Sequence, residues 1–261
     1  EQTYKTYIQE PPNVMPRFYE GRGHQGVQRR IYPYPYDDGL TKRTEMGDYP
    51  MIFLENEYIH LKIAPEQGGR IYTAYDKTND YKWFYENDVV KPSMIGMVGN
   101  WRSGGNAWGY QHHHGPHTVE NMDYEIEEHS DGSKTVWINT TDRLMRVNIL
   151  IGYTVYPNSS IVEMTINPRN RTPLGHSFLF WANPSVHVDS AYQVIFPPSV
   201  QYVTHHAKRE MTSWPIADSY YGNYDFTGID ISWWKNTHVP GSFFSWNPLE
   251  DYFGGYDYNL Q

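Results

Sequence analysis

Residues 51–76, MIFLENEYIHLKIAPEQGGRIYTAYD, indicate how this chain folds. Apolar and polar side chains alternate through residues 57–63, and a period of two is the pattern of a half-buried β-strand. Residues 65–69 carry Pro and a Gly pair, and residues 76–79 are Asp-Lys-Thr-Asn, so both segments are rich in turn formers. The stretch therefore predicts consecutive strands joined by tight turns.

The same alternation returns at regular intervals toward the C-terminus, and helical periodicity is nearly absent. Asp131-Gly132 between two such segments is a hairpin signal. Short, regularly spaced strands with turn signals are typical of a β-sandwich or a β-barrel. Further strands are expected at residues 122–128, 135–138, 143–154, 160–167, 177–181, 192–196 and 242–246.

Residues 1–47 differ from the rest of the chain because they are rich in Pro, Tyr and Gly. They include Pro11-Pro12 and, at residues 32–36, Tyr-Pro-Tyr-Pro-Tyr. Such a segment cannot form a long helix or a central strand. We expect an extended N-terminal arm over residues 1–47, packed on a β-sandwich body formed by residues 48–261.

The composition favours aromatic packing and argues against several classes of partner. Hydrophobic residues make up 39% of the chain, and aromatic residues make up 16%, with 24 Tyr and 9 Trp. Tyr and Trp combine an apolar ring with a polar group, and this surplus is typical of β-rich proteins and of carbohydrate sites. The net charge of −9 argues against a nucleic-acid partner. No apolar run reaches the roughly 18–20 residues of a membrane-spanning helix.

The chain contains no cysteine and begins at Glu1. Absence of cysteine is compatible with a periplasmic or secreted bacterial protein and with many cytosolic ones. The start at Glu1, without an initiator Met, indicates a chain that is processed or is a piece of a longer one, and we expect a periplasmic or extracellular location with the signal peptide removed.

Residues 104–117, GGNAWGYQHHHGPH, form the segment richest in chemically useful side chains. Histidine suits proton transfer and metal ligation, and glycine allows close backbone approach. The alternative is a structural loop whose histidines bond to neighbouring carbonyls. Tetrahedral zinc needs three or four ligands, and the segment lacks a clear ligand set, so no metal and no cofactor are expected. The candidate residues here are Trp108, His112, His113, His114 and His117.

From about Pro11 to its end the chain resembles a bacterial family known as domain of unknown function 5107, which in turn is similar to the galactose-mutarotase-like superfamily. That resemblance implies a large antiparallel two-sheet β-sandwich. The segments that carry it are residues 32–35, 54–59, 65–71, 76–79, 91–92, 112–114, 131–137, 170–173, 181–183, 194–198, 213–215 and 253–257.

The chain departs from the family pattern in two places. The family usually has a glutamate in the glycine-rich loop where this chain has Ala107. The family's domain also continues into further strands after residues 254–257, which implies that this chain is a short variant or a fragment.

The resemblance implies a carbohydrate-active protein, and three functions remain open: a glycoside hydrolase, preferred here, an aldose 1-epimerase, or a non-catalytic glycan-binding module. The partner expected in all three is an oligosaccharide or polysaccharide. Residues 183–187 resemble the Asn-Pro-x-x-His element that carries the acid of mutarotases, which implies an acid role for His187. Its alternative is a strand-end histidine bonded to a carbonyl.

The remaining site candidates come from the residues themselves. Hydrolysis ordinarily needs two carboxylates, and Glu55, Glu57 and Glu66 are available, although each also fits an exposed strand-edge charge. Arg70 is expected to bind sugar hydroxyls or a carboxylate, or else to pair with Glu66 or Asp76. We predict His114, His187 and Glu57 as catalytic residues, and one substrate pocket bordered by Arg70, Trp108, His112, His113, His117, Trp181 and Trp214.

Overall fold

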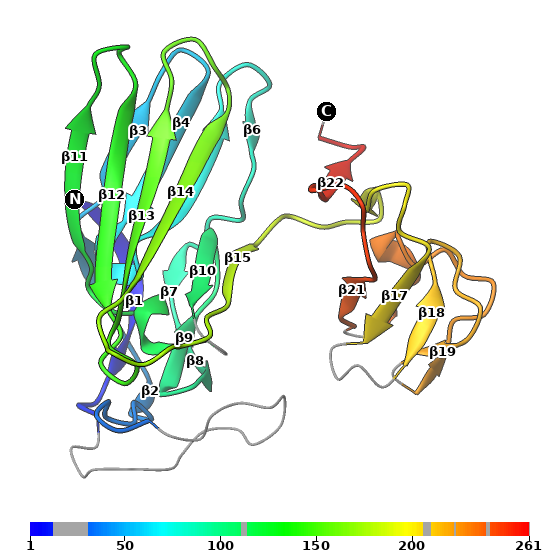
Figure 1. The fold of residues 1–261 in the computed structure, drawn as a ribbon, viewed down its shortest axis with the longest axis horizontal. Helices are drawn as coiled ribbons and strands as arrows, with labels where there is room; N and C mark the ends of the chain where they lie inside the picture. Colours follow the sequence, from blue (N-terminus) through cyan, green and yellow to red (C-terminus); the bar gives the residue numbers. More distant parts are fainter. Residues whose placement is uncertain (13–30, 111–113, 206–209, 222, 239–240, 261) are drawn as a thin grey trace. The chain divides into compact units, whose positions relative to one another are not determined.

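The computed structural model describes residues 1–12, 31–110, 114–205, 210–221, 223–238 and 241–260. Within them lie 22 strands and three short 3₁₀ helices (Figure 1). The predicted all-β class is therefore confirmed. The chain divides into two compact units, Glu1–Val186 and His187–Gln261, and each is described by itself.

The first main sheet of the larger unit contains residues 51–76 at its centre and one edge. Its strand order is β15–β10–β5–β4–β3, with β6 attached to β5, and every pairing is antiparallel. The turn between β4 and β5 contains the 3₁₀ helix η1 (Pro65–Gln67). The strands are β3 (Ile52–Glu55), β4 (Ile59–Ala64), β5 (Arg70–Asp76), β6 (Tyr81–Lys82), β10 (Asn106–Tyr110) and β15 (Phe180–Pro184).

The second main sheet is an antiparallel meander of four strands in the order β11–β12–β13–β14. Asp131 accepts hydrogen bonds from the backbone N–H and the hydroxyl of Ser133, which closes the predicted hairpin between β11 and β12. The strands are β11 (Asp123–Glu128), β12 (Lys134–Thr141), β13 (Val147–Val155) and β14 (Val162–Asn170).

The two main sheets pack face to face around one hydrophobic core (Figure 1). Leu61 and Ile63 of β4 and Ile149 and Ile151 of β13 are completely buried in it. These residues sit at alternate positions of their strands, as the period of two predicts. The core therefore has the form of a sandwich, with one inward face from each sheet.

The N-terminal segment forms strands instead of a simple arm. Strand β1 (Gln2–Gln9) lies between β2 (Leu40–Tyr49), which is antiparallel to it, and β7 (Val89–Val90), which is parallel. It is thus a central strand, which the proline content argued against. The described prolines of this segment all lie between β1 and β2, so both strands keep their N–H donors. The boundary expected between residues 47 and 48 falls inside β2.

Two further elements complete the description of the larger unit. The hairpin of β8 (Pro92–Gly96) and β9 (Gly99–Arg102) is antiparallel. The 3₁₀ helix η2 (Pro116–Thr118) follows the histidine segment. Both lie at the β10 end of the sandwich, because β10 contacts η2 and follows β9 directly.

The smaller unit has its own core, formed by Val200, Val203, Ala217, Phe226 and Ile231. Its sheets are β16–β22, β18–β17–β21 and β19–β20. Its strands are β16 (Tyr192–Ile195), β17 (Tyr202–His205), β18 (Met211–Ser213), β19 (Tyr220–Tyr221), β20 (Tyr224–Asp225), β21 (Phe243–Ser245) and β22 (Gly254–Asp257), and its 3₁₀ helix is η3 (Trp234–Asn236).

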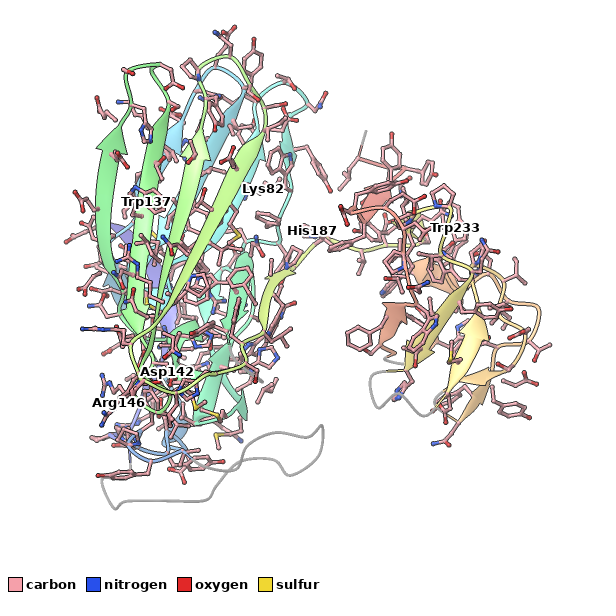
Figure 2. All side chains as sticks on the ribbon, in the orientation of Figure 1. Lys82, Trp137, Asp142, Arg146, His187 and Trp233 are labelled. Atoms are coloured by element: carbon pink, nitrogen blue, oxygen red, sulfur yellow. The ribbon has the colours of Figure 1, made fainter. Side chains whose placement is uncertain are left out.

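Large rings lie directly across glycines on paired strands of the larger unit. Trp181 of β15 covers Gly109 of β10, and Trp137 of β12, labelled in Figure 2, covers Gly152 of β13. In each pair a side chain at the glycine would collide with the ring. The ring shields the backbone that glycine leaves bare, a pairing known to stabilise glycine in sheets.

The completely buried Ile151 and the 53% exposed Ile126 provide a matched test of the core. We expect Ile151→Ala to lower the free energy of unfolding by about 2–5 kcal/mol, because it leaves a cavity between the sheets. Ile126→Ala is expected to change it by less than about 1 kcal/mol. Urea unfolding of both variants measures the difference, and equal losses would contradict the position of the core.

Candidate functional site

The histidine segment spans β10, the start of η2 and residues between them. His112 and His113 lie outside the described residues, so their predicted role in substrate binding stays a prediction. His114 and His117 are described, and the structure places them in different surroundings. His114 is half-buried, whereas His117 is only 3% exposed.

His117 belongs to the interior of the larger unit. Its ring stacks on Trp108 with 4.9 Å between centroids, and Trp108 is itself only 2% exposed. The backbone N–H of Tyr110 donates a hydrogen bond of 3.0 Å to Nε2 of His117. Burial lowers the pKa of His117 to about 3, with a smaller effect from His114. The imidazole is therefore neutral and carries its proton on Nδ1.

Trp108 and His117 thus pack the interior instead of lining an open pocket. The reason for Trp108 is the alternation along β10, which turns Trp108 and Tyr110 to the same buried face. A structural loop was the alternative expected for these histidines. The surroundings of His117 match that alternative, with a backbone N–H as its partner.

Arg70 is also an interior residue, with 1% of its surface exposed. Its guanidinium donates to four backbone carbonyls, with distances between 2.7 and 3.1 Å. The acceptors are Gln67, Arg102, Gly104 and Thr118. Burial lowers the pKa of Arg70 to about 10, and the neighbouring charge of Arg102 acts in the same direction. Neither expected alternative, a ligand contact or an ion pair with Glu66 or Asp76, accounts for these bonds.

The opposite face of β10 presents a different set of groups. Because Gly109 pairs with Trp181 and Ala107 pairs with Asn183, these four residues share the face that points away from Trp108. The ring of His114 meets the indole of Trp181 edge-on, with 4.8 Å between centroids. The indole of Trp101 lies 5.3 Å from His114 on its other side.

We call Trp101, His114 and Trp181 the aromatic cluster. All three residues are half-buried, and the indole nitrogen of Trp101 is fully buried. Ala107 and Asn183 lie beside Trp181 on the same face, and the backbone carbonyl of His114 is held by the N–H of Met97 at 2.7 Å. The cluster joins two predicted site residues, His114 and Trp181, to Trp101, which the sequence analysis did not single out.

Glu57 lies at the other end of the larger unit. It is exposed in the β3–β4 turn and lines a hollow of about 260 Å³ with Tyr156 and Lys134. Asn56 closes this turn by accepting the N–H groups of Tyr58 and Ile59. Strand β5 runs between Glu57 and the aromatic cluster. Its last residue, Asp76, pairs with Ile59, which follows Glu57 by two residues, whereas Ile71 near its start pairs with Asn106 of β10. Ile71 and Asp76 are five residues apart, which at about 3.3 Å per residue is a separation of roughly 16 Å along the strand.

His187 and Trp214 belong to the smaller unit. His187 is exposed at the first position of that unit (Figure 2). Trp214 is half-buried and packs on Phe196, with 4.7 Å between ring centroids. The structure therefore brings together His114 and Trp181 of the predicted pocket, and it places His187 and Trp214 in a separate unit.

A pair of carboxyl groups near η2 was missed by the sequence analysis. Glu120 is half-buried, and burial raises its pKa, against the opposing charge of Arg143. Asp142 is 7% exposed, and burial raises its pKa as well. Tyr34 donates a hydrogen bond of 3.2 Å to Asp142. Glu120 follows the last histidine of the segment by three residues, and that proximity is the signal that could have identified it.

The described residues contain no group of three or more metal-ligating side chains. Nor does any helix in the described ranges have the length and apolar character needed to cross a membrane. The statement about metal-ligating side chains does not include His112 and His113.

Comparison with known proteins places the chain in a family. A family model described as "Domain of unknown function (DUF5107)" matches residues 27–261. The chain belongs to this family. It is also similar to a solved structure, a TPR-domain containing protein from Parabacteroides distasonis ATCC 8503, with a TM-score of 0.81 and 18% sequence identity. The match covers 99% of this chain and 41% of that one, and at this identity it shows a shared fold alone.

For this DUF5107 chain, the buried His117 makes stability depend on pH. Its pKa is about 3 in the folded chain, against about 6.5 for an unperturbed histidine. Between these values the unfolded chain binds one more proton, so the free energy of unfolding rises with pH by up to about 1.4 kcal/mol per unit. We expect His117→Gln to lose this dependence of the unfolding free energy on pH, because the glutamine side chain does not titrate. Its amide oxygen still accepts the hydrogen bond from the backbone N–H of Tyr110.

Urea unfolding at several pH values between about 4 and 6.5 measures this slope. The exposed His187→Gln is the matched control and should keep the slope of the parent chain. If His117→Gln keeps it too, the folded chain protonates His117 and the assignment of a neutral imidazole is wrong.

Proposed function

We propose that this domain is the glycan-binding part of a carbohydrate-active protein and that a sugar ring is bound at the aromatic cluster. The observation that carries the proposal is the contiguous arrangement of Trp101, His114 and Trp181 on the face of β10 and β15 that points away from the core. Large aromatic side chains with a few polar groups beside them are typical of small-molecule sites.

The chemistry of the cluster suits a neutral polyhydroxylated ring. An indole offers a flat apolar surface for the C–H groups of a sugar, and its N–H is a hydrogen-bond donor. The imidazole of His114 and the amide of Asn183 have both donor and acceptor capacity for hydroxyl groups. Ala107 projects only a methyl group beside them and is itself buried.

The galactose-mutarotase type of sandwich is part of the same proposal. Two antiparallel sheets packed on a common core support it, as does membership in the family. A periplasmic or extracellular location is also part of this proposal, because a protein that binds polymeric glycans would encounter them in these compartments.

Binding of a panel of neutral and acidic oligosaccharides, measured by isothermal titration calorimetry, tests the proposal. We expect Trp181→Ala to weaken binding about 10-fold or more, because loss of one aromatic contact is worth about 0.5–1.5 kcal/mol beyond the buried area. Trp137→Ala is the matched control, since it also removes an indole that covers a strand glycine.

The control should bind as tightly as the parent chain. Equal weakening by both substitutions would show that the effect comes from an uncovered glycine and not from a lost sugar contact. Absence of binding by the parent chain to every glycan would remove the proposed function.

Hydrolysis of the bound glycan is the second candidate function, and Glu120 favours it. A general acid must be protonated at the working pH, and burial raises the pKa of this carboxyl group. Glu120 and His114 lie on either side of η2, so the acid is close in sequence to the aromatic cluster. Asp142, whose charge acts on Glu120, is the second carboxyl group of the pair.

If the domain is a hydrolase, Glu120→Gln should lower the rate about 10²-fold or more while leaving glycan affinity unchanged. Release of reducing sugar from the bound glycan measures the rate. The exposed Glu125→Gln on β11 is the control and should keep the parent rate. Loss of turnover in Glu57→Gln with full activity in Glu120→Gln would instead favour the carboxylate predicted from the sequence.

A further inference from the structure

A cavity of about 140 Å³ lies between the two main sheets of the larger unit, near the edge where β14 is the last strand. Its inner side includes Leu61 of β4 and Tyr153 of β13, which are completely buried. Its outer side includes Val162 and Met164 of β14, which are only half-buried. The cavity is therefore part of the sandwich core and approaches the surface at one open edge.

An irregularity in the pairing of β4 with β5 helps to create this space. The register of the two strands shifts there, and Ile71 and Ala74, which are three residues apart, both line the cavity. Strict alternation would turn them to opposite faces of the sheet. The small side chain of Ala74 then fills little of the gap between the sheets.

Asn106 is a polar residue in the lining of this cavity. It pairs with Ile71 across β10 and β5, so the two side chains leave the same face of the sheet. Among the described residues its side chain makes no hydrogen bond, and its Oδ1 is buried. A buried amide that lacks partners destabilises a fold, so its presence on a core-facing position needs an explanation.

Water is a poor occupant for this cavity. The hydroxyl of Tyr153 already donates a hydrogen bond of 3.0 Å to the carbonyl of Gly69, and burial raises the pKa of Tyr153, so this group stays neutral. Within the lining, the amide of Asn106 is left as the unpaired polar group. A buried water needs about two to four polar partners. An occupant with its own apolar surface and one polar group suits the cavity better.

The size and the lining define the class of that occupant. An apolar protein cavity of about 150 Å³ accommodates one benzene ring, and the volume here is about 140 Å³. Trp83 and Phe84 add aromatic walls, which favour a ring in an offset or edge-to-face arrangement. The amide of Asn106 has both donor and acceptor capacity, and a hydroxyl group can bond to it in either role.

We propose that this cavity is a binding site for a small phenol, a single aromatic ring that carries a hydroxyl group. The ring contacts Trp83 and Phe84, and the hydroxyl group bonds to the amide of Asn106. The ligand enters at the edge of the sandwich, between the half-buried Val162 and Met164 of β14 and the two aromatic walls. Because Asn106 shares the core-facing side of β10 with Trp108, this site is separate from the aromatic cluster and does not rest on the proposed function.

Ligand-detected NMR titrations with phenol, toluene and hexanoate test the site. Toluene offers the ring without the hydroxyl group, and hexanoate offers an acyl chain without a ring. We expect phenol to bind the parent chain, and Asn106→Leu to lower the affinity for phenol relative to toluene roughly fivefold, which corresponds to the loss of one hydrogen bond. Any change in packing acts on both rings, so the ratio of the two affinities isolates the amide.

A variant that fills the cavity tests where the ligand binds. Val162→Phe places a ring into the space from the edge strand and should weaken the binding of both phenol and toluene at least about 10-fold, with a Tm equal to or above that of the parent chain. Asn167→Phe puts the same ring on the outward face of β14, where the residue is exposed, and should bind as the parent chain does. Ala74→Val narrows the same cavity from its inner side and replaces Val162→Phe if that variant does not fold.

Four results would overturn the proposal. The first is absence of phenol binding by the parent chain, and the second is phenol binding that the filling variant leaves unchanged, which would place the ligand elsewhere. The third is an equal loss of phenol and toluene in Asn106→Leu, because the amide would then have no part in recognition. The fourth is binding of hexanoate without phenol, which would make the cavity a site for an acyl chain. None of these results bears on glycan binding at the aromatic cluster.

Discussion

The guanidinium of Arg70 is the group on which the β10 end of the larger unit depends. It is buried, and its donors are shared among the carbonyls of η1, the end of β9, the β9–β10 turn and η2. A single planar cation with five donors holds them at defined distances, which a lysine with one point of charge would not do.

Glycines make these four bonds geometrically possible. Gly68 and Gly104 both have a positive φ, and a side chain at Gly68 would collide with the backbone of His117 and Thr118. The backbone therefore approaches the guanidinium closely in two tight turns. These turns join η1, the β9–β10 turn and η2, and His114, which precedes η2, contacts Trp181.

The charge in this region contrasts with the charge of the whole chain. The chain has a net charge of −9, yet its β10 end buries two guanidinium groups without a salt bridge among the described residues. Arg70 links backbone segments through four hydrogen bonds, and Nε of Arg102 has no hydrogen-bond partner. On the opposite side of β9, Trp101 contributes to the aromatic cluster.

Local patterns in the sequence determined much of the fold. Alternation along residues 57–63 and the turn formers at residues 65–69 correctly indicated β4, the turn and β5, because strand pairing depends on a period of two and on a few turn residues. The same rule located most of the β11–β14 meander. It failed for β1, since this strand gains its partners, β2 and β7, only from distant parts of the chain.

The site was decided by the tertiary structure. Residue type alone predicted Arg70, Trp108 and His117 as ligand contacts, but burial turned all three to the interior. Burial depends on which elements cover a strand, and no local pattern encodes the position of β9 and η2 over β10. By itself, the sequence determined the β-strands, the turns and the presence of a histidine and aromatic segment. Only packing decided which side of that segment faces solvent, because each strand has two faces and the tertiary contacts select between them.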